Sequence, residues 1–259
     1  MIYYKTPEEI ERIRKSSLLV SRALAEVAKH IKPGITTIKL DAVADEFIRD
    51  HGGFPAFLGY RGFPNSACIS VNEVVVHGIP GETVLKDGDI VSVDIGVVLD
   101  EFYGDSAFTF PVGDISEAKQ RLLNTTRQSL ELGVQQAKIG GRIGDIAATI
   151  QEYVERHGYS VVRELVGHGV GKKLHEDPEV PNYGKRGSGA KLQEGLVIAI
   201  EPMVNMGKKQ VMQANDGWTI FTEDHQPSAH FEHTVAVTRD GPQMLTTFRF
   251  IEEVLNVAV

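Results

Sequence analysis

The sequence predicts an α/β fold built from two similar halves, each with two helices followed by strands. Gly34 and Gly140 each end a helical segment, and they lie 106 residues apart. Asp94 and Glu201 hold matching positions in two similar strand-like segments and lie 107 residues apart. Such boundaries can recur by chance in an α/β protein, but two spacings that agree within one residue favour an internal repeat. We therefore expect one domain, residues 1–259, with an internal pseudo-two-fold repeat.

The first half opens with two expected helices. Thr6 can cap the first helix, Pro7 suits its first position, and Glu9 completes a capping box. Apolar residues at helical spacing continue this helix until the stop signal at residues 32–34. The second helix is expected near residues 38–49.

The second half repeats this order. Ser116 is a candidate cap for a helix over about residues 117–138, and a further helix is expected near residues 145–156. We place the two halves at approximately residues 1–113 and 114–259.

Two acidic residues fall in strand-like segments of the first half. Asp94 interrupts the apolar run 90–98, and Asp105 precedes the run 107–110. A hairpin between these runs would place the two carboxylates nearly opposite each other, about 5 Å apart. Their repulsion, about 3 kcal/mol at an effective dielectric constant of about 20, requires a shared proton, an Arg or Lys side chain, or a metal ion.

The second half supplies an equivalent pair of acids. Glu201 ends a strand at residues 196–200, and Glu232 begins a strand at residues 234–237. The internal repeat would bring all four carboxylates to one centre, where their charge matches two divalent cations. His168 can complete such a site. A single acid could face water or pair with a base, but four at related positions favour metals.

The ligand types restrict the metal. Oxygen ligands with one imidazole and no thiolate suit Co, Mn, Fe or Zn better than Cu, and the sequence leaves the choice among these four open.

Composition excludes several classes of protein. The net charge is −8, and no run of Lys or Arg exceeds two residues, which argues against a nucleic-acid surface. No apolar stretch reaches the roughly 18 residues of a membrane helix. With one cysteine, Cys68, no intrachain disulfide can form, which fits a reducing compartment. We expect a cytoplasmic monomer without membrane or direct nucleic-acid contacts.

Seven short motifs, spread in order over essentially the whole chain, together resemble those of type I methionine aminopeptidases. They are HGIP (77–80), VDIG (93–96), GDS (104–106), GHGVG (167–171), LHEDP (174–178), IEP (200–202) and FEHT (231–234). The resemblance implies the pita-bread fold, in which two pseudo-symmetric α/β halves surround a dinuclear metal site.

The resemblance also implies how the metals are held. The residue matching Asp94 chelates one metal, and those matching His168 and Glu201 hold the other. The residues matching Asp105 and Glu232 bridge both. Two such ions would lower the pKa of a shared water, and Glu201 would take its proton as general base.

Two further histidines receive catalytic roles from the resemblance. His175 would help to hold the oxyanion, and His77 would hydrogen-bond the scissile amide nitrogen. By spacing alone, each His-x-x-Pro segment could equally just shape a loop. The substrate's free amine would bind a metal, which restricts cleavage to the first residue.

The same resemblance places a methionine pocket within residues 55–68 and beside one tryptophan. The substrate-binding residues it implies are Phe57, Tyr60, Phe63, Cys68, His77, His175 and Trp218. Bacterial relatives commonly have Cys and Tyr where Phe57 and Phe63 stand, which bears on pocket depth. From the sequence alone, an aromatic cluster is more often core, and Trp218 would pack a loop against the body.

The remaining histidines and a cation site complete the expectations. Asn72, Val74 and Ser228 match backbone positions that bind a monovalent cation in some relatives. We expect His233 to point away from the face that Glu232 occupies. The other histidines are expected at the surface or at helix ends: His30, His51, His157, His225 and His230.

The resemblance implies a metal-dependent aminopeptidase that removes the N-terminal methionine from nascent proteins and peptides. It would prefer a small second residue and could associate with the ribosome. One alternative is an Xaa-Pro aminopeptidase or dipeptidase of the same fold, which usually carries a large extra N-terminal domain. Another is a non-catalytic pita-bread binding protein, which would have lost metal ligands. Type II enzymes carry an insertion that the 31-residue span from Glu201 to Glu232 lacks.

Overall fold

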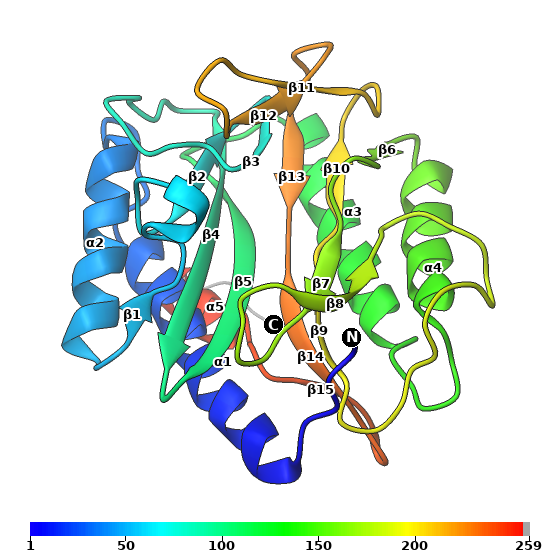
Figure 1. Cartoon of the computed structure of the whole chain (residues 1–259). Helices are drawn as coiled ribbons and strands as arrows, with labels where there is room; N and C mark the ends of the chain where they lie inside the picture. Colours follow the sequence, from blue (N-terminus) through cyan, green and yellow to red (C-terminus); the bar gives the residue numbers. More distant parts are fainter. Residues whose placement is uncertain (256–259) are drawn as a thin grey trace.

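The four helices expected from the sequence are all present in the computed structural model, which describes residues 1–255. They are α1 (Pro7–Ala28), α2 (Thr37–Asp50), α3 (Glu117–Val134) and α4 (Ile143–Arg156), and a short helix, α5 (Arg249–Leu255), follows that was not expected. The pair α1 and α2 lies on one side of the strands and the pair α3 and α4 on the other (Figure 1). None of the helices in the described residues is long and apolar enough to cross a membrane.

The capping residues predict the first residue of α1 and of α3 more accurately than the stop signals predict the last residue. The capping box of α1 is present, with the Glu9 amide donating to Thr6 Oγ1 and the Thr6 amide donating to Glu9 Oε2. However, α1 ends at Ala28 and α3 at Val134, several residues before the predicted stops. Hydrogen-bonded turns, such as His30 N to Val27 O, continue the chain beyond each helix without helical geometry.

Within residues 1–255 the strands pair into four antiparallel sheets. The first contains β1 (Phe54–Pro55), β4 (Ile90–Leu99) and β2 (Cys68–Val71), with β5 (Phe102–Pro111) paired to β4. The second has the order β13 (Ser228–His230), β10 (Met203–Asn205), β6 (Ser160–Val161). The third has the order β11 (Val211–Gln213), β12 (Ile220–Thr222), β3 (Val74–Val76). The fourth has the order β15 (Gly241–Met244), β14 (His233–Thr238), β9 (Val197–Ile200), β7 (Gly167–Gly169), β8 (Glu176–Val180).

Helix–helix–strand order recurs along the chain, with α1 and α2 before the β4–β5 hairpin and α3 and α4 before β9 and β14. The limits of the two halves stay a prediction. In Figure 1, β5 and β14 lie side by side near the middle of the molecule, so the strands that follow each helix pair meet there.

Side-chain hydroxyls join β5 to the segment around β14. Thr109 Oγ1 donates to the His230 carbonyl at 2.8 Å, and Ser106 Oγ donates to the Glu232 carbonyl at 2.7 Å. Thr234 Oγ1 donates to the Asp105 carbonyl at 2.8 Å. These bonds lie in the buried interior, where an unpaired carbonyl is costly. We call this set of contacts the β5–β14 seam.

Helix α1 lies directly on β5. Ser16 Oγ donates to the Phe102 carbonyl at 2.8 Å, and Gly104 faces the helix backbone. A Cβ atom at Gly104 would lie 2.5 Å from Ser17 N and 2.7 Å from Ser17 Cα. Only glycine permits this distance, because helix backbone cannot rotate out of the way as a side chain can.

Gly104→Ala should therefore lower the free energy of unfolding by about 1–3 kcal/mol, because α1 must move away from β5. Urea unfolding would measure the change. Gly81→Ala is the matched control, since its Cβ would meet nothing within 4 Å. It should stay within about 0.5 kcal/mol of the parent protein. Equal stability of the two variants would contradict the close packing of α1 on β5.

Candidate metal centre and peptide pocket

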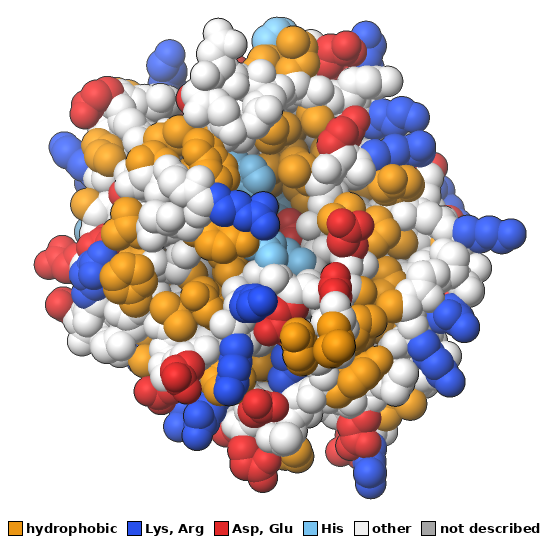
Figure 2. Space-filling model, viewed as in Figure 1, with side chains coloured by type: hydrophobic (Ala, Val, Ile, Leu, Met, Phe, Trp, Pro, Cys, Tyr) orange, Lys and Arg blue, Asp and Glu red, His pale blue; other side chains and the backbone are white. Residues whose placement is uncertain are grey.

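A cavity of about 270 Å³ opens between the strands on the face shown in Figure 2, where histidines lie in a hollow bordered by hydrophobic side chains. Every residue that the sequence predicts to be catalytic, to hold a divalent metal or to bind substrate lines this cavity: Phe57, Tyr60, Phe63, Cys68, His77, Asp94, Asp105, His168, His175, Glu201, Trp218 and Glu232. The geometry thus collects the candidates in one place, while their individual roles stay predictions.

The β4–β5 hairpin supplies the first two carboxylates, but not in the predicted register. Asp94 pairs with Ala107, so Asp105 lies two positions along β5 rather than opposite, and it lies inside the strand. The reason is the turn at Asp100 and Glu101, which both have positive φ and form a two-residue connection. The offset of two keeps both side chains on the same face of the sheet.

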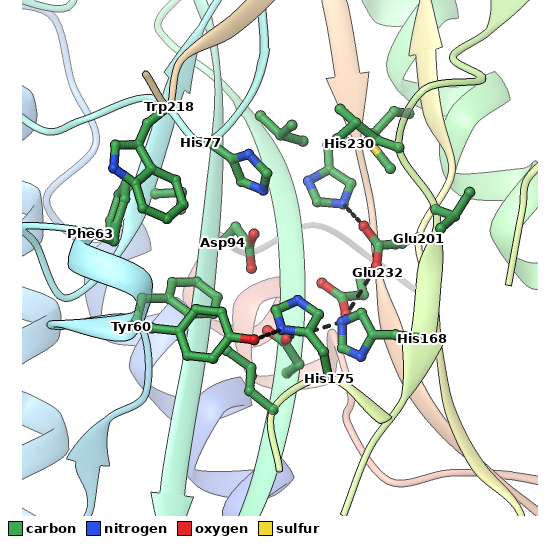
Figure 3. Close-up of a pocket in the computed structure, with 18 of the residues that line it drawn as sticks. Tyr60, Phe63, His77, Asp94, His168, His175, Glu201, Trp218, His230 and Glu232 are labelled. Carbon is green, nitrogen blue, oxygen red and sulfur yellow. Dashed lines mark hydrogen bonds and ion pairs between the residues drawn. The ribbon is translucent and has the colours of Figure 1, made fainter. Parts of the chain in front are cut away.

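The second half supplies two more carboxylates and an imidazole. Glu201 directly follows β9, Glu232 directly precedes β14, and His168 is the central residue of β7. His168 Nε2 lies 3.6 Å from Glu201 Oε1 and 3.7 Å from Asp105 Oδ2. Ligand atoms of Asp105, His168 and Glu232 all lie within 4.8 Å of one another. Figure 3 shows Asp94, Glu201 and Glu232 directed toward the same space.

His168 has the orientation of a metal ligand. Its Nδ1 lies 2.9 Å from the Gly169 carbonyl, which can only accept, so Nδ1 carries the hydrogen. Nε2 then presents its lone pair to the carboxylates. Burial lowers the pKa of His168 to about 4, which keeps the ring neutral, the form that binds metals.

Within the described part of the chain, the carboxylates have no Lys or Arg partner. None of the ion pairs within residues 1–255 joins a Lys or Arg to Asp94, Asp105, Glu201 or Glu232. Three of their buried oxygens, Asp94 Oδ1, Asp105 Oδ1 and Glu232 Oε1, lack any hydrogen-bond partner.

This isolation raises the carboxylate pKa values. Burial raises the pKa of Asp94 to about 7. Burial, followed by the charges of Asp94 and Glu201, raises the pKa of Asp105 well above its usual range, and Glu232 behaves likewise. Of the three ways to offset the repulsion, an Arg or Lys partner is absent within residues 1–255, which leaves a shared proton or metal ions. Oxygen donors around one neutral imidazole fit divalent metal ions.

The two histidines predicted to act on the substrate, His77 and His175, lie across the cavity from each other in Figure 3. His175 precedes β8, and its ring centroid is 4.2 Å from that of His168. The pKa of His175 is lowered, first by desolvation and then by the nearby His168 and Arg61. Burial likewise lowers the pKa of His77, which follows β3 with a positive φ. Both rings are therefore neutral and each offers one N–H.

Aromatic side chains form an apolar slot beside the carboxylates. Phe63 meets Trp218 edge-on at 5.2 Å, and Phe57 packs so closely on β4 that a Cβ at Gly96 would lie 2.7 Å from its ring. Cys68 pairs with Asp94 across β2 and β4. Burial raises the pKa of its thiol, which suits a wall residue and not a nucleophile.

Comparison with known proteins places this site in a family. A sequence profile for metallopeptidase family M24 matches residues 11–239. The chain belongs to this family. It is 52% identical over 246 residues to methionine aminopeptidase 1 of Bacillus subtilis, covering 95% of this chain and 99% of that protein. It is 44% identical over 247 residues to methionine aminopeptidase of Escherichia coli, covering 95% and 94%.

Solved structures agree with this membership. The structure matches that of methionine aminopeptidase from Rickettsia prowazekii with a TM-score of 0.94 and 41% identity, covering 95% of this chain and 100% of that one. Prolidase from Pyrococcus furiosus matches with a TM-score of 0.78 and 24% identity, covering 94% of this chain and 65% of that one, which shows a shared fold. The expected pita-bread fold and the resemblance to methionine aminopeptidases are confirmed.

The predicted location of one histidine, His230, is wrong. His230 was expected at the surface or a helix end, but it is 2% exposed and lines the cavity. Its Nε2 lies 3.7 Å from Glu201 Oε2 and has no hydrogen-bond partner. Strand alternation could have located it, since residues 230 and 232 share a face. The same alternation correctly turns His233 away, onto Thr246 Oγ1 at 2.7 Å.

The other expected positions are found where the sequence put them. His30, His51, His157 and His225 are exposed, and His51 and His157 follow the ends of α2 and α4. The Ser228 amide donates to the Asn72 carbonyl at 2.9 Å, so two of the three residues expected at a monovalent-cation site are in contact. Cation binding there stays a prediction.

Asp105→Asn should stabilise the metal-free protein by about 1–3 kcal/mol, because it removes one of several mutually repelling buried carboxylates. It should also reduce the increase in melting temperature that divalent metal gives the parent protein, because a ligand is lost. Differential scanning calorimetry in EDTA and in Mn²⁺ would measure both effects.

Asp41→Asn is the matched control. Asp41 is a buried carboxylate outside the cavity that accepts hydrogen bonds from Asn65 Nδ2 and from the Ser66 and Ala67 amides. Its amide variant should destabilise the protein equally with and without metal. If Asp105→Asn behaves like this control, the four carboxylates do not form a metal centre.

Proposed function

We propose that the protein is a metal-dependent aminopeptidase that removes the N-terminal methionine from nascent proteins and peptides. The observation that carries the proposal is one cavity in which an apolar slot directly adjoins a neutral imidazole and four carboxylates, three of which have a buried oxygen without a hydrogen-bond partner. Relatives named methionine aminopeptidase, about half identical over nearly the whole chain, support it. Neither alternative is favoured: the prolidases share only the fold, and all five expected ligands are present.

The proposed metal ligands are Asp94, Asp105, His168, Glu201 and Glu232, with Asp105 and Glu232 shared between two divalent ions. Their oxygen-rich, single-imidazole composition supports Co, Mn, Fe or Zn. When bound, two such ions supply electrophilic polarisation of the peptide carbonyl and a nucleophile at neutral pH. We also propose a monovalent cation at Asn72, Val74 and Ser228.

Glu201 is the proposed general base. Its carboxylate lies between two imidazoles, with Oε1 facing His168 and Oε2 facing His230. Burial raises its pKa well above the usual range, so the carboxylate has a strong tendency to accept and hold a proton. Glu201 takes the proton from the attacking water and can return it to the leaving amine.

His175 and His77 act on the peptide bond itself. Each neutral ring has one N–H to donate. His175 donates to the carbonyl oxygen as negative charge develops on it, which lowers the barrier more than it tightens substrate binding. His77, beside Trp218 at a ring distance of 6.2 Å, donates to the scissile amide nitrogen.

The slot selects the first residue. Phe63, Cys68 and Trp218 form apolar walls for an unbranched thioether side chain, with Phe57 at the base against β4. The second residue has to lie among the carboxylates and the two histidines. Little volume is left there for a large side chain.

We further propose that the protein works in the cytoplasm as a monomer, on peptides and on nascent chains at the ribosome. Its net charge of −8 makes direct binding to nucleic acid unfavourable, so any association with the ribosome would use local surface features.

Peptides Met-Xaa-Ser with Ala, Gly or Ser second should be cleaved roughly 10–10² times faster, as kcat/KM, than those with Leu, Arg or Glu. The crowded space around the scissile bond is the reason. Mass spectrometry of products from metal-loaded protein would measure this, with Ala-Pro-Ala as the comparison substrate. Release of the residue before proline, without methionine release, would overturn the proposed function in favour of an Xaa-Pro peptidase.

His175→Ala should reduce kcat by roughly 10²–10³ while bound metal stays unchanged, because one oxyanion donor is lost. Metal analysis of the purified variant would separate the two effects. Glu232→Ala is the contrasting variant and should lose both metal and activity. Loss of metal from His175→Ala would show that this residue is a ligand instead.

A further inference from the structure

The Tyr60 side chain makes a contact that a pocket wall does not need. Its hydroxyl oxygen lies 2.8 Å from His175 Nδ1, with ring centroids 5.1 Å apart (Figure 3). A phenol O–H is more acidic than an imidazole N–H, and an imidazole nitrogen accepts better than a phenol oxygen. Tyr60 is therefore the donor and Nδ1 the acceptor. A neutral ring that accepts at Nδ1 carries its hydrogen on Nε2.

The turn around Tyr60 holds the hydroxyl in place. The Tyr60 amide donates to the Phe57 carbonyl at 2.9 Å, and the Phe63 amide donates back to the Tyr60 carbonyl at 2.9 Å. The Gly59 amide closes the loop on the Phe63 carbonyl at 2.8 Å. Arg61 adopts a positive φ of 49°, an uncommon conformation for a side chain of its size. Such strain persists where the surrounding contacts determine the conformation.

The loop that bears His175 is held from the opposite side. Glu176, the next residue, forms an ion pair with Lys5 at 2.7 Å, and both side chains are at most 5% exposed. The second Glu176 oxygen accepts from the Lys173 amide. A buried pair of this kind permits little displacement, because separating it would leave two uncompensated charges. Both partners of the Tyr60–His175 bond are thus fixed by their own segments.

We propose that Tyr60 is a positioning residue that holds His175 in the tautomer with hydrogen on Nε2. In that tautomer His175 can donate to a developing oxyanion. In the other tautomer Nε2 would present a lone pair to the same oxygen and repel it. This inference rests on the proposed function, and it adds a role to Tyr60 that the size and apolarity of the pocket do not require.

Nitrogen NMR of protein labelled with ¹⁵N-histidine and loaded with Zn²⁺ would read the tautomer directly. His175→Ala would assign the resonances. We expect His175 of the parent protein to have hydrogen on Nε2 alone, and Tyr60→Phe to give a mixture of the two tautomers. Tyr153→Phe is the matched control, since Tyr153 also packs on a histidine, His157, at 4.3 Å but on α4, away from the cavity. It should leave the His175 signals unchanged.

Kinetics with Met-Ala-Ser would test the consequence. Tyr60→Phe keeps the ring, so KM should change less than about twofold while kcat falls roughly 10–10²-fold, with unchanged bound metal. In a His175→Ala background the same substitution should change kcat less than about twofold. An equal loss in both backgrounds, a change in KM alone, or an Nδ1–H tautomer in the parent protein would overturn the proposal.

The NMR measurement needs no peptide. If the parent protein releases no methionine, the proposed function fails while the tautomer result still decides whether Tyr60 positions His175. If methionine is released and the tautomer does not depend on Tyr60, only the further inference fails.

Discussion

The candidate site depends on the β5–β14 seam. The hydroxyls of Ser106, Thr109 and Thr234 bond to backbone across it, and two of these bonds involve the backbone of Asp105 and Glu232 themselves. A slip of one residue in this pairing would turn a carboxylate from the cavity to the opposite face of its strand. Short, buried hydroxyl bonds resist such a slip, because every misplaced register would leave polar groups unpaired. The seam therefore sets which carboxylates meet.

The same interaction explains why the protein can tolerate like charges in its interior. The four carboxylates repel one another when they are ionised. A less tightly packed set of strands would let them move apart or let water in between them. Packing beside the seam, such as the aromatic contact of Phe108 with Phe231 at 4.9 Å, opposes this relaxation. The chain thus carries a locally unfavourable arrangement that a bound cation would convert into a favourable one.

Local signals were enough to predict helices α1 to α4 and to single out the four carboxylates that line the cavity. The capping box at Thr6 predicted the start of α1, and the internal repeat related Asp94 to Glu201. The register of Asp94 and Asp105 could not be predicted, because Asp100 and Glu101 lack the glycine that usually marks a two-residue turn with two positive φ values. Long-range contacts were also hidden: Tyr60 and His175 are 115 residues apart, and no sequence pattern connects them. His230 is different, since strand alternation places residues 230 and 232 on one face and is enough to locate His230 in the cavity.

The seam also has a consequence for the order of folding. Asp105 and Thr234 are bonded across 129 residues, so their contact closes a long loop of the chain. We expect contacts between residues so far apart in the sequence to form late, after the local helices and the β4–β5 hairpin. The carboxylates therefore stay hydrated and apart during most of folding and are dehydrated together in the final docking of the strands. A cation that needs all four carboxylates as ligands can bind only after the strands have docked. Its binding should therefore slow unfolding much more than it accelerates folding.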